Sequence, residues 1–124
     1  MKLMKLYEES IGEYIGYHGT RAKFNKFSLD NAPQRIIWFS SNLQNVKDGK
    51  VGALGGGYIA KAKITIKNPA NWDAYDKKSL WELQSEGYDG GILPDGDEVT
   101  YFVFSPDQVK ILEWIKFDSY SKGK

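Results

Sequence analysis

The sequence predicts a single α+β domain built on a mostly antiparallel β-sheet. Its 124 residues, 41% of them hydrophobic and 27% charged, suffice for a folded domain with a modest core. Residues 58–66 alternate between apolar and polar side chains, which is the period of a half-buried strand. Asp95-Gly96, a strong turn signal, joins two apolar runs into a hairpin. Short strands joined by hairpins and mixed with helical segments favour an antiparallel sheet.

Strands are expected at six places along the chain. The second shows little alternation, which predicts burial on both faces. Lys67-Asn68-Pro69 ends the third, and a tight Ser-Pro-Asp-Gln turn precedes the last. The first runs into a turn at His18. The expected strands cover residues 13–17, 35–41, 58–66, 88–92, 99–104 and 109–115.

Helices are expected at 2–11, 42–47 and 76–86. The first carries apolar side chains at helical spacing. Ser41 is a candidate N-cap for the second. Gly87 ends the third.

Side chains of one helix and one loop are expected to pack into the core, and a third segment is expected to be a connection. In the third helix Leu80, Leu83 and Trp81 are expected to pack. The loop at 19–33 should turn Phe24 and Phe27 inward. Residues 51–57, mostly glycine, should form a flexible connection.

Composition excludes several classes of site. A formal net charge of +1 gives no large basic surplus for nucleic acid. The chain has no cysteine and one histidine, so neither thiolate chemistry nor a metal site is expected. No apolar run approaches the roughly 20 residues of a membrane-spanning helix, and the N-terminus does not look like a secretory signal. We therefore expect a cytoplasmic monomer without membrane contacts.

Three separated blocks carry a further signal. They are YHGT at 17–20, IIWFSSN at 36–42, and GYDGGI at 87–92 continuing into VTYFVFSPDQVKI at 99–111. In this order they resemble the ADP-ribosyltransferase family of the His-Tyr-Glu type, most closely its small bacterial and phage polyvalent-protein branch. The resemblance implies the ADP-ribosyltransferase-like fold, with a split, mostly antiparallel sheet and short helices. It also implies NAD as co-substrate and no metal.

The first block, which begins at Tyr17, would contact NAD. His18 matches the family histidine that hydrogen-bonds the adenosine ribose. Gly19 would let the main chain approach the nicotinamide amide, because glycine has no Cβ. Thr20 would add a hydroxyl contact to the ribose. The alternative for His18 is a half-buried structural histidine bonded to a main-chain carbonyl.

The second block would form the floor of the same site. Trp38 stands where the family carries a tyrosine, which keeps a flat ring and loses the phenol. Phe39, Ser40 and Ser41 would line the floor beside it. Tyr58 is the nearest candidate for the aromatic ring that sandwiches nicotinamide.

The third block departs from the family pattern. Thr100 occupies the position of the family glutamate, which holds the ribose 2′-hydroxyl and stabilises the oxocarbenium ion. Glu98 lies two residues earlier and would point to the same face of a regular strand, about 7 Å away. We take Glu98 and Thr100 as the catalytic candidates. The alternative for Glu98 is a solvated charge beside a hairpin turn.

The resemblance implies an NAD-dependent mono-ADP-ribosyltransferase that modifies a protein or nucleic-acid acceptor. One alternative is NAD hydrolysis with water as the acceptor. Another is a catalytically silent module that binds NAD or ADP-ribose, which the missing glutamate favours. A third is an interaction domain whose aromatic side chains all belong to the core.

The N-terminal segment suggests a setting for this activity. Residues 1–13 contain the triplets Leu6-Tyr7-Glu8 and Ile11-Gly12-Glu13. They resemble capsid-targeting peptides of large tailed phages, which a prohead protease cuts after such triplets. The alternative is a plain helix packed on the sheet. We accordingly divide the chain into this segment, an ADP-ribosyltransferase-like domain at 14–116 and a polar tail at 117–124.

Overall fold

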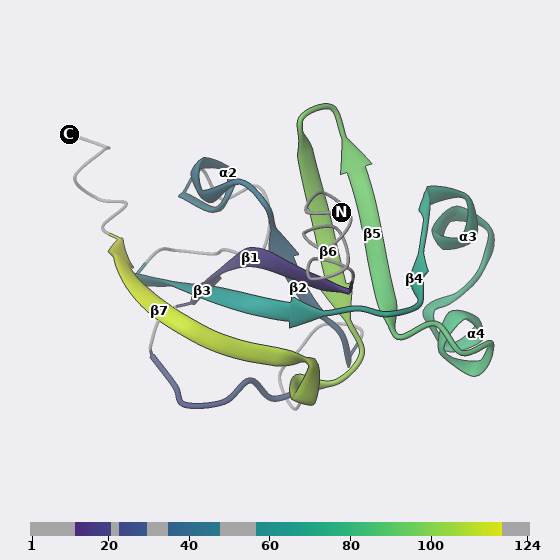
Figure 1. The fold of residues 1–124 in the computed structure, drawn as a ribbon, viewed down its shortest axis with the longest axis horizontal. Helices are drawn as coiled ribbons and strands as arrows, with labels where there is room; N and C mark the ends of the chain where they lie inside the picture. Colours follow the sequence, from purple (N-terminus) through teal and green to yellow (C-terminus); the bar gives the residue numbers. More distant parts are fainter. Residues whose placement is uncertain (1–11, 21–22, 30–34, 48–56, 118–124) are drawn as a thin grey trace, which may run out of the picture.

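The chain folds around one seven-stranded mixed sheet, mostly antiparallel, with short helices (Figure 1). The computed structural model describes residues 12–20, 23–29, 35–47 and 57–117. The strand order is β4-β5-β6-β2-β1-β3-β7, and only β4 and β5 pair in parallel. The α+β prediction is confirmed at this level. The strands are β1 (Glu13–Thr20), β2 (Ile37–Ser40), β3 (Gly57–Thr65), β4 (Pro69–Ala70), β5 (Gly90–Asp95), β6 (Glu98–Val103) and β7 (Val109–Phe117).

The expected strands are confirmed, with changed ends. β1 continues past its predicted end because it stays in register with β3 as far as the pair Thr20↔Tyr58. His18 therefore lies within a strand, and the turn predicted there is wrong. β2 is shorter than expected. Ile37 and Phe39 are buried as predicted, whereas Trp38 is only partly buried.

The sheet nearly divides between β1 and β2. Their ladder contains the single pair Tyr17↔Ser40, whereas β1 and β3 are paired from Glu13 to Thr20. In Figure 1, β5 and β6 run steeply across the direction of β3 and β7. The sheet thus has two halves, β4-β5-β6-β2 and β1-β3-β7, which meet at one residue pair.

The first described helix, α2 (Leu43–Lys47), follows β2 directly. Asn42 caps it, because its Oδ1 accepts a hydrogen bond from Gln44 N at 2.8 Å. The predicted cap, Ser41, has a different partner: its Oγ accepts from Val99 N at 2.9 Å. The Ser41 prediction is therefore wrong by one residue, because β6 takes up that hydroxyl.

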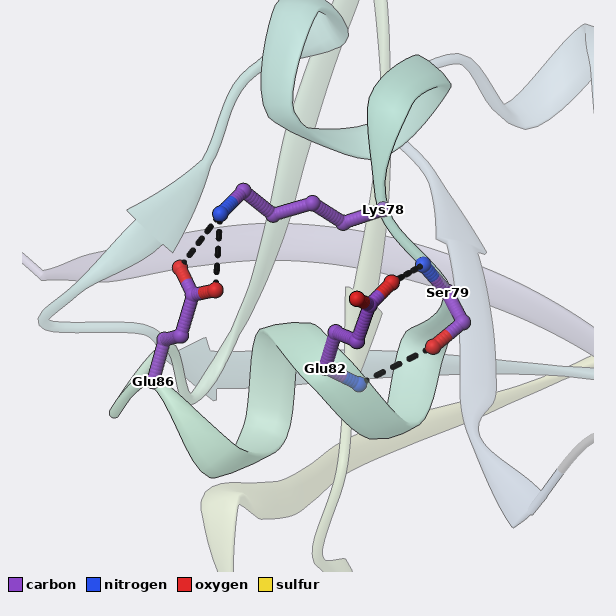
Figure 2. Close-up of polar contacts among 4 residues, drawn as sticks. All are labelled: Lys78, Ser79, Glu82 and Glu86. Carbon is purple, nitrogen blue, oxygen red and sulfur yellow. Dashed lines mark hydrogen bonds and ion pairs between the residues drawn. The ribbon is translucent and has the colours of Figure 1, made fainter.

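The single helix predicted at 76–86 is in fact two, α3 (Trp72–Lys77) and α4 (Leu80–Ser85). Ser79 begins the second helix through a reciprocal capping box with Glu82 (Figure 2). Ser79 Oγ accepts from Glu82 N at 3.1 Å, and the Glu82 carboxylate accepts from Ser79 N at 2.8 Å. Such a box fixes an N-cap in extended backbone, so one continuous helix cannot pass through it.

The same region corrects one packing prediction. Leu83 is fully buried, as expected, but Trp81 is 75% exposed. Lys78 Nζ reaches along α4 to both Glu86 oxygens at 2.7 Å (Figure 2).

Within the described ranges, no helix is long and apolar enough to cross a membrane.

The two faces of the sheet are covered differently. On the loop face, residues 23–29 contribute Phe24 and buried Phe27 to the core around Phe39, which confirms their inward orientation. On the helix face, α3 and α4 pack over Phe102, and α2 packs over Ile59. On the helix face each half of the sheet therefore has its own cluster of side chains, whereas the cluster on the loop face spans both halves.

The described strands reach slightly past the predicted domain limits. β1 begins at Glu13, one residue before the predicted start, and β7 ends at Phe117, one residue after the predicted end. The helix predicted at 2–11 and most of the glycine-rich connection and polar tail lie outside the described residues.

Gly91 marks the tightest packing in the sheet. A Cβ there would meet Cε2 of the fully buried Phe102 ring at 2.0 Å. Gly91→Ala should therefore lower the free energy of unfolding by about 3 kcal/mol, the upper end of the usual cost of overpacking a core. Chemical denaturation measures this effect. In the double variant with Phe102→Leu, the loss of unfolding free energy should be smaller than the sum of the losses in the two single variants. Strict additivity would contradict this account.

Candidate functional site

His18 lies where the two halves of the sheet meet. Its Nδ1 is 2.7 Å from the main-chain oxygen of Trp38 on β2. Because a carbonyl oxygen only accepts, Nδ1 carries the hydrogen and donates it. The ring thus turns toward the main chain of the neighbouring strand. This is the contact expected of a structural histidine, and it also fixes the direction in which the rest of the ring points.

Aromatic rings hold the imidazole from its other sides. The Phe27 ring packs edge-on with its centroid 5.1 Å away, and the Phe39 ring lies at 5.6 Å. Burial lowers the pKa of His18 from its usual 6.5, and the hydrogen bond to Trp38 only partly opposes this. The ring is therefore neutral at pH 7. With Nδ1–H committed to Trp38, Nε2 carries the lone pair and acts as an acceptor.

A row of candidates crosses the helix face beside this histidine. Tyr17 is opposite Ser40, and Ser40 is opposite Thr100. Residues directly opposite share a face, and Tyr17 packs against the cluster under α2. Ser40 is fully buried, whereas Tyr17 and Thr100 are partly exposed. The structure therefore brings these three together on one face.

Trp38 lies on this helix face too. Its ring contacts Phe102 at 5.1 Å and Tyr75 of α3 at 6.1 Å between centroids. Its side chain is thus part of the packing under α3 and α4, and its main-chain oxygen is the atom that meets His18. Gly19 is opposite Ile59, so it also belongs to the helix face.

Glu98 lies at the start of β6, on the same face as Thr100 by strand alternation. Its Oε2 accepts a hydrogen bond from Asn42 Nδ2 at 2.8 Å. The side chain is partly exposed. Glu98 is therefore held beside the N-terminus of α2, at the end of the row that contains Thr100.

Four of the predicted residues lie on the loop face instead. His18, Phe39 and the pair Thr20↔Tyr58 share that face. Tyr58 contacts the ring of Trp114 at 6.4 Å, and Lys23 Nζ lies 5.6 Å from its centroid. Ser41 Oγ accepts from the main chain of β6. The predicted residues are thus divided between the two faces of the sheet, with His18 on the loop face and Glu98 and Thr100 on the helix face.

Asn42 is a site residue that sequence reasoning did not single out. It closes the IIWFSSN block and stands immediately before a helix, where asparagine is a preferred N-cap. That signal locates the cap. It does not reveal the contact with Glu98, which joins residues 56 positions apart.

Comparison with known protein families, curated proteins and solved structures identifies no relative of this chain. Over the described part of the chain, no group of three or more His, Cys, Asp or Glu side chains could hold a metal ion.

The lowered pKa of His18 predicts a pH dependence of stability. The unfolded chain binds a proton more readily than the folded chain, so the free energy of unfolding should fall as pH drops below about 6.5 and level off above it. His18 is the only histidine in the sequence, so replacing it should remove this component. Urea denaturation of the wild type and His18→Asn between pH 7.5 and 5.5 measures the difference. Parallel profiles for the two proteins would contradict the assignment.

Proposed function

We propose that the protein is an NAD-dependent mono-ADP-ribosyltransferase with an ADP-ribosyltransferase-like fold. The observation that carries the proposal is the meeting of the three sequence blocks. The first lies on β1, the second on β2 and the third on β5 and β6, and β6, β2 and β1 are neighbours in the sheet. Blocks far apart in sequence are thus on neighbouring strands, with His18 on the loop face and Glu98 and Thr100 on the helix face beside the junction of the two halves.

His18 supports a ligand role in addition to its structural bond. With Nδ1–H donated to Trp38, Nε2 is an acceptor in a fixed direction. No described residue is a hydrogen-bond partner of Nε2. A ribose hydroxyl is a donor of matching chemistry, and a pre-oriented acceptor binds it without reorganising.

The reaction requires little covalent chemistry from the protein. The bond between C1′ of the nicotinamide ribose and the ring nitrogen breaks, and nicotinamide leaves with the electron pair. An acceptor nucleophile then bonds to C1′ and releases its proton. Positive charge develops on the ribose in between, and a carboxylate stabilises it. Glu98 is the carboxylate next to the Tyr17–Ser40–Thr100 row, and Thr100 supplies a hydroxyl in that row.

Three other functions are separated by simple measurements. A silent NAD or ADP-ribose module would bind NAD without releasing nicotinamide. An NAD glycohydrolase would release nicotinamide and yield free ADP-ribose. An interaction domain would show no NAD binding in calorimetry. The bond between Asn42 and Glu98 favours the enzyme, because it holds a carboxylate in one place beside the row.

The phage-effector setting rests on residues 1–13, most of which lie outside the described residues. A cut after Glu13 would fall inside β1, whose first pair is Glu13↔Thr65. It would also remove the hydrogen bond from Ile66 N to Gly12 O at 2.8 Å. Both contacts lie at the end of the strand remote from His18, so the site would survive such maturation. An effector carried in a virion and acting in the host cytoplasm remains part of the proposal.

Two substitutions at His18 separate its structural role from its ligand role. His18→Asn can place an amide N–H near the Nδ1 position and keep the bond to Trp38, but it lacks Nε2. It should fold like the wild type and bind NAD at least 10-fold more weakly, the scale of a hydrogen bond lost to a ligand. His18→Gln can place an oxygen near Nε2 and should retain more affinity. Calorimetric titration with NAD measures both, and wild-type affinity in His18→Asn would refute the ligand role.

Glu98→Gln should reduce nicotinamide release by about 10²-fold, because it removes the charge that stabilises the transition state. The affinity for NAD should change little. The amide oxygen of glutamine still accepts from Asn42, so the melting temperature should be kept. Asp95→Asn makes the same charge change at the residue opposite Glu98 and serves as the control. Full activity in Glu98→Gln would point to Thr100 with substrate-assisted chemistry.

A further inference from the structure

We infer that Asn42 is a positioning residue that holds the Glu98 carboxylate for catalysis. This inference rests on the proposed function, since it assigns Asn42 a role through Glu98. The hydrogen bond of 2.8 Å between Asn42 Nδ2 and Glu98 Oε2 is its geometric basis. Hydrogen bonds from Asn42 to α2 and to β2 fix the direction in which its amide donates.

The amide of Asn42 can donate to Glu98 in only one orientation. Its Oδ1 accepts from Gln44 N at 2.8 Å, the first turn of α2. Its main-chain N donates to Ser40 Oγ at 3.0 Å. With the oxygen committed to the helix, the NH2 group must face away from it, toward β6. The cap of α2 therefore also aims the donor at the carboxylate.

The main chain next to Glu98 is fixed by the same turn. Ser41 N donates to Val99 O at 2.8 Å, and Val99 N donates to Ser41 Oγ at 2.9 Å. The residue after Glu98 is thus bound at both its polar main-chain atoms. The side chain of Glu98 and the main chain of the next residue are therefore both hydrogen-bonded to the turn that follows β2.

Residues 38–42, which cover β2 from Trp38 onward and the turn after it, make two contacts on either side of Ser40. Trp38 holds the imidazole of His18 through its carbonyl, and Asn42 holds the Glu98 carboxylate through its amide. The separation of the two proposed site groups is therefore set by one chain segment of five residues, 38–42. A glutamate at 98 rather than 100 can serve because the turn after β2, not the strand alone, places it.

Asn42→Asp is the sharpest test, because it changes one group and keeps the shape. The aspartate oxygen still caps α2, since aspartate is as good an N-cap as asparagine. Its second oxygen replaces the donor with a negative charge facing Glu98. We expect kcat for nicotinamide release to fall at least 10-fold with KM for NAD nearly unchanged, and the melting temperature to fall modestly because the two carboxylates repel each other. Asn42→Ala removes cap and donor together and should lower both kcat and stability.

The double variant Asn42→Asp with Glu98→Gln distinguishes positioning from packing. The glutamine NH2 can donate to the new aspartate, so the hydrogen bond is restored with its direction reversed and the Glu98 charge is absent. Its stability should match the wild type. Its kcat should equal that of Glu98→Gln alone, because Asn42 acts only through the charge of Glu98.

The outcomes separate this inference from the function on which it rests. If the wild type releases nicotinamide and Asn42→Asp keeps the same kcat, the positioning role is refuted and the proposed function stands. If kcat falls only in proportion to the folded fraction, Asn42 is a helix cap and nothing more. A wild type that never releases nicotinamide refutes the proposed function, and the positioning role with it.

Discussion

The hydrogen bond between His18 and the main-chain oxygen of Trp38 is the contact on which the arrangement of the site depends. Strands β1 and β2 share a single ladder pair, so a main-chain carbonyl at their junction needs a donor from elsewhere. The imidazole supplies it at 2.7 Å. The same bond sets the tautomer and turns Nε2 into an acceptor, while burial lowers the pKa of the ring and keeps it neutral. The bond that the junction requires thus also orients the acceptor that we propose binds the ligand.

Packing around this junction explains why it can be held so closely. Gly16 precedes it on β1, and a Cβ there would meet Phe39 Cβ at 2.7 Å and Ile64 Cδ1 at 2.6 Å. Only glycine lets β1 approach the buried Phe39 ring before the strands part. Phe27 then closes the loop face over His18. The helix face carries the row that ends at Glu98, so histidine and carboxylate approach the same junction from the two faces.

Local signals predicted the regular elements well, and long-range contacts decided the rest. The alternation at 58–66 and the turn at Asp95-Gly96 located β3 and the β5–β6 hairpin. The extension of β1 through His18 depends on pairing with β3, about forty residues later, which no local pattern reveals. The Ser79-Leu-Trp-Glu82 capping signature marks the start of α4 in the sequence, whereas helical periodicity alone predicts one continuous helix. The pairing of Asn42 with Glu98 is tertiary, and only the structure identifies it.

The most direct test of the central claim is to follow both ends of NAD at once. The wild-type protein is incubated in cell lysate with NAD labelled in the nicotinamide ring and, separately, in the adenine. The account predicts that the first label is released as free nicotinamide while the second becomes attached to protein or nucleic acid. Free labelled ADP-ribose alone would identify a glycohydrolase. NAD that remains intact while bound to the protein would contradict the account.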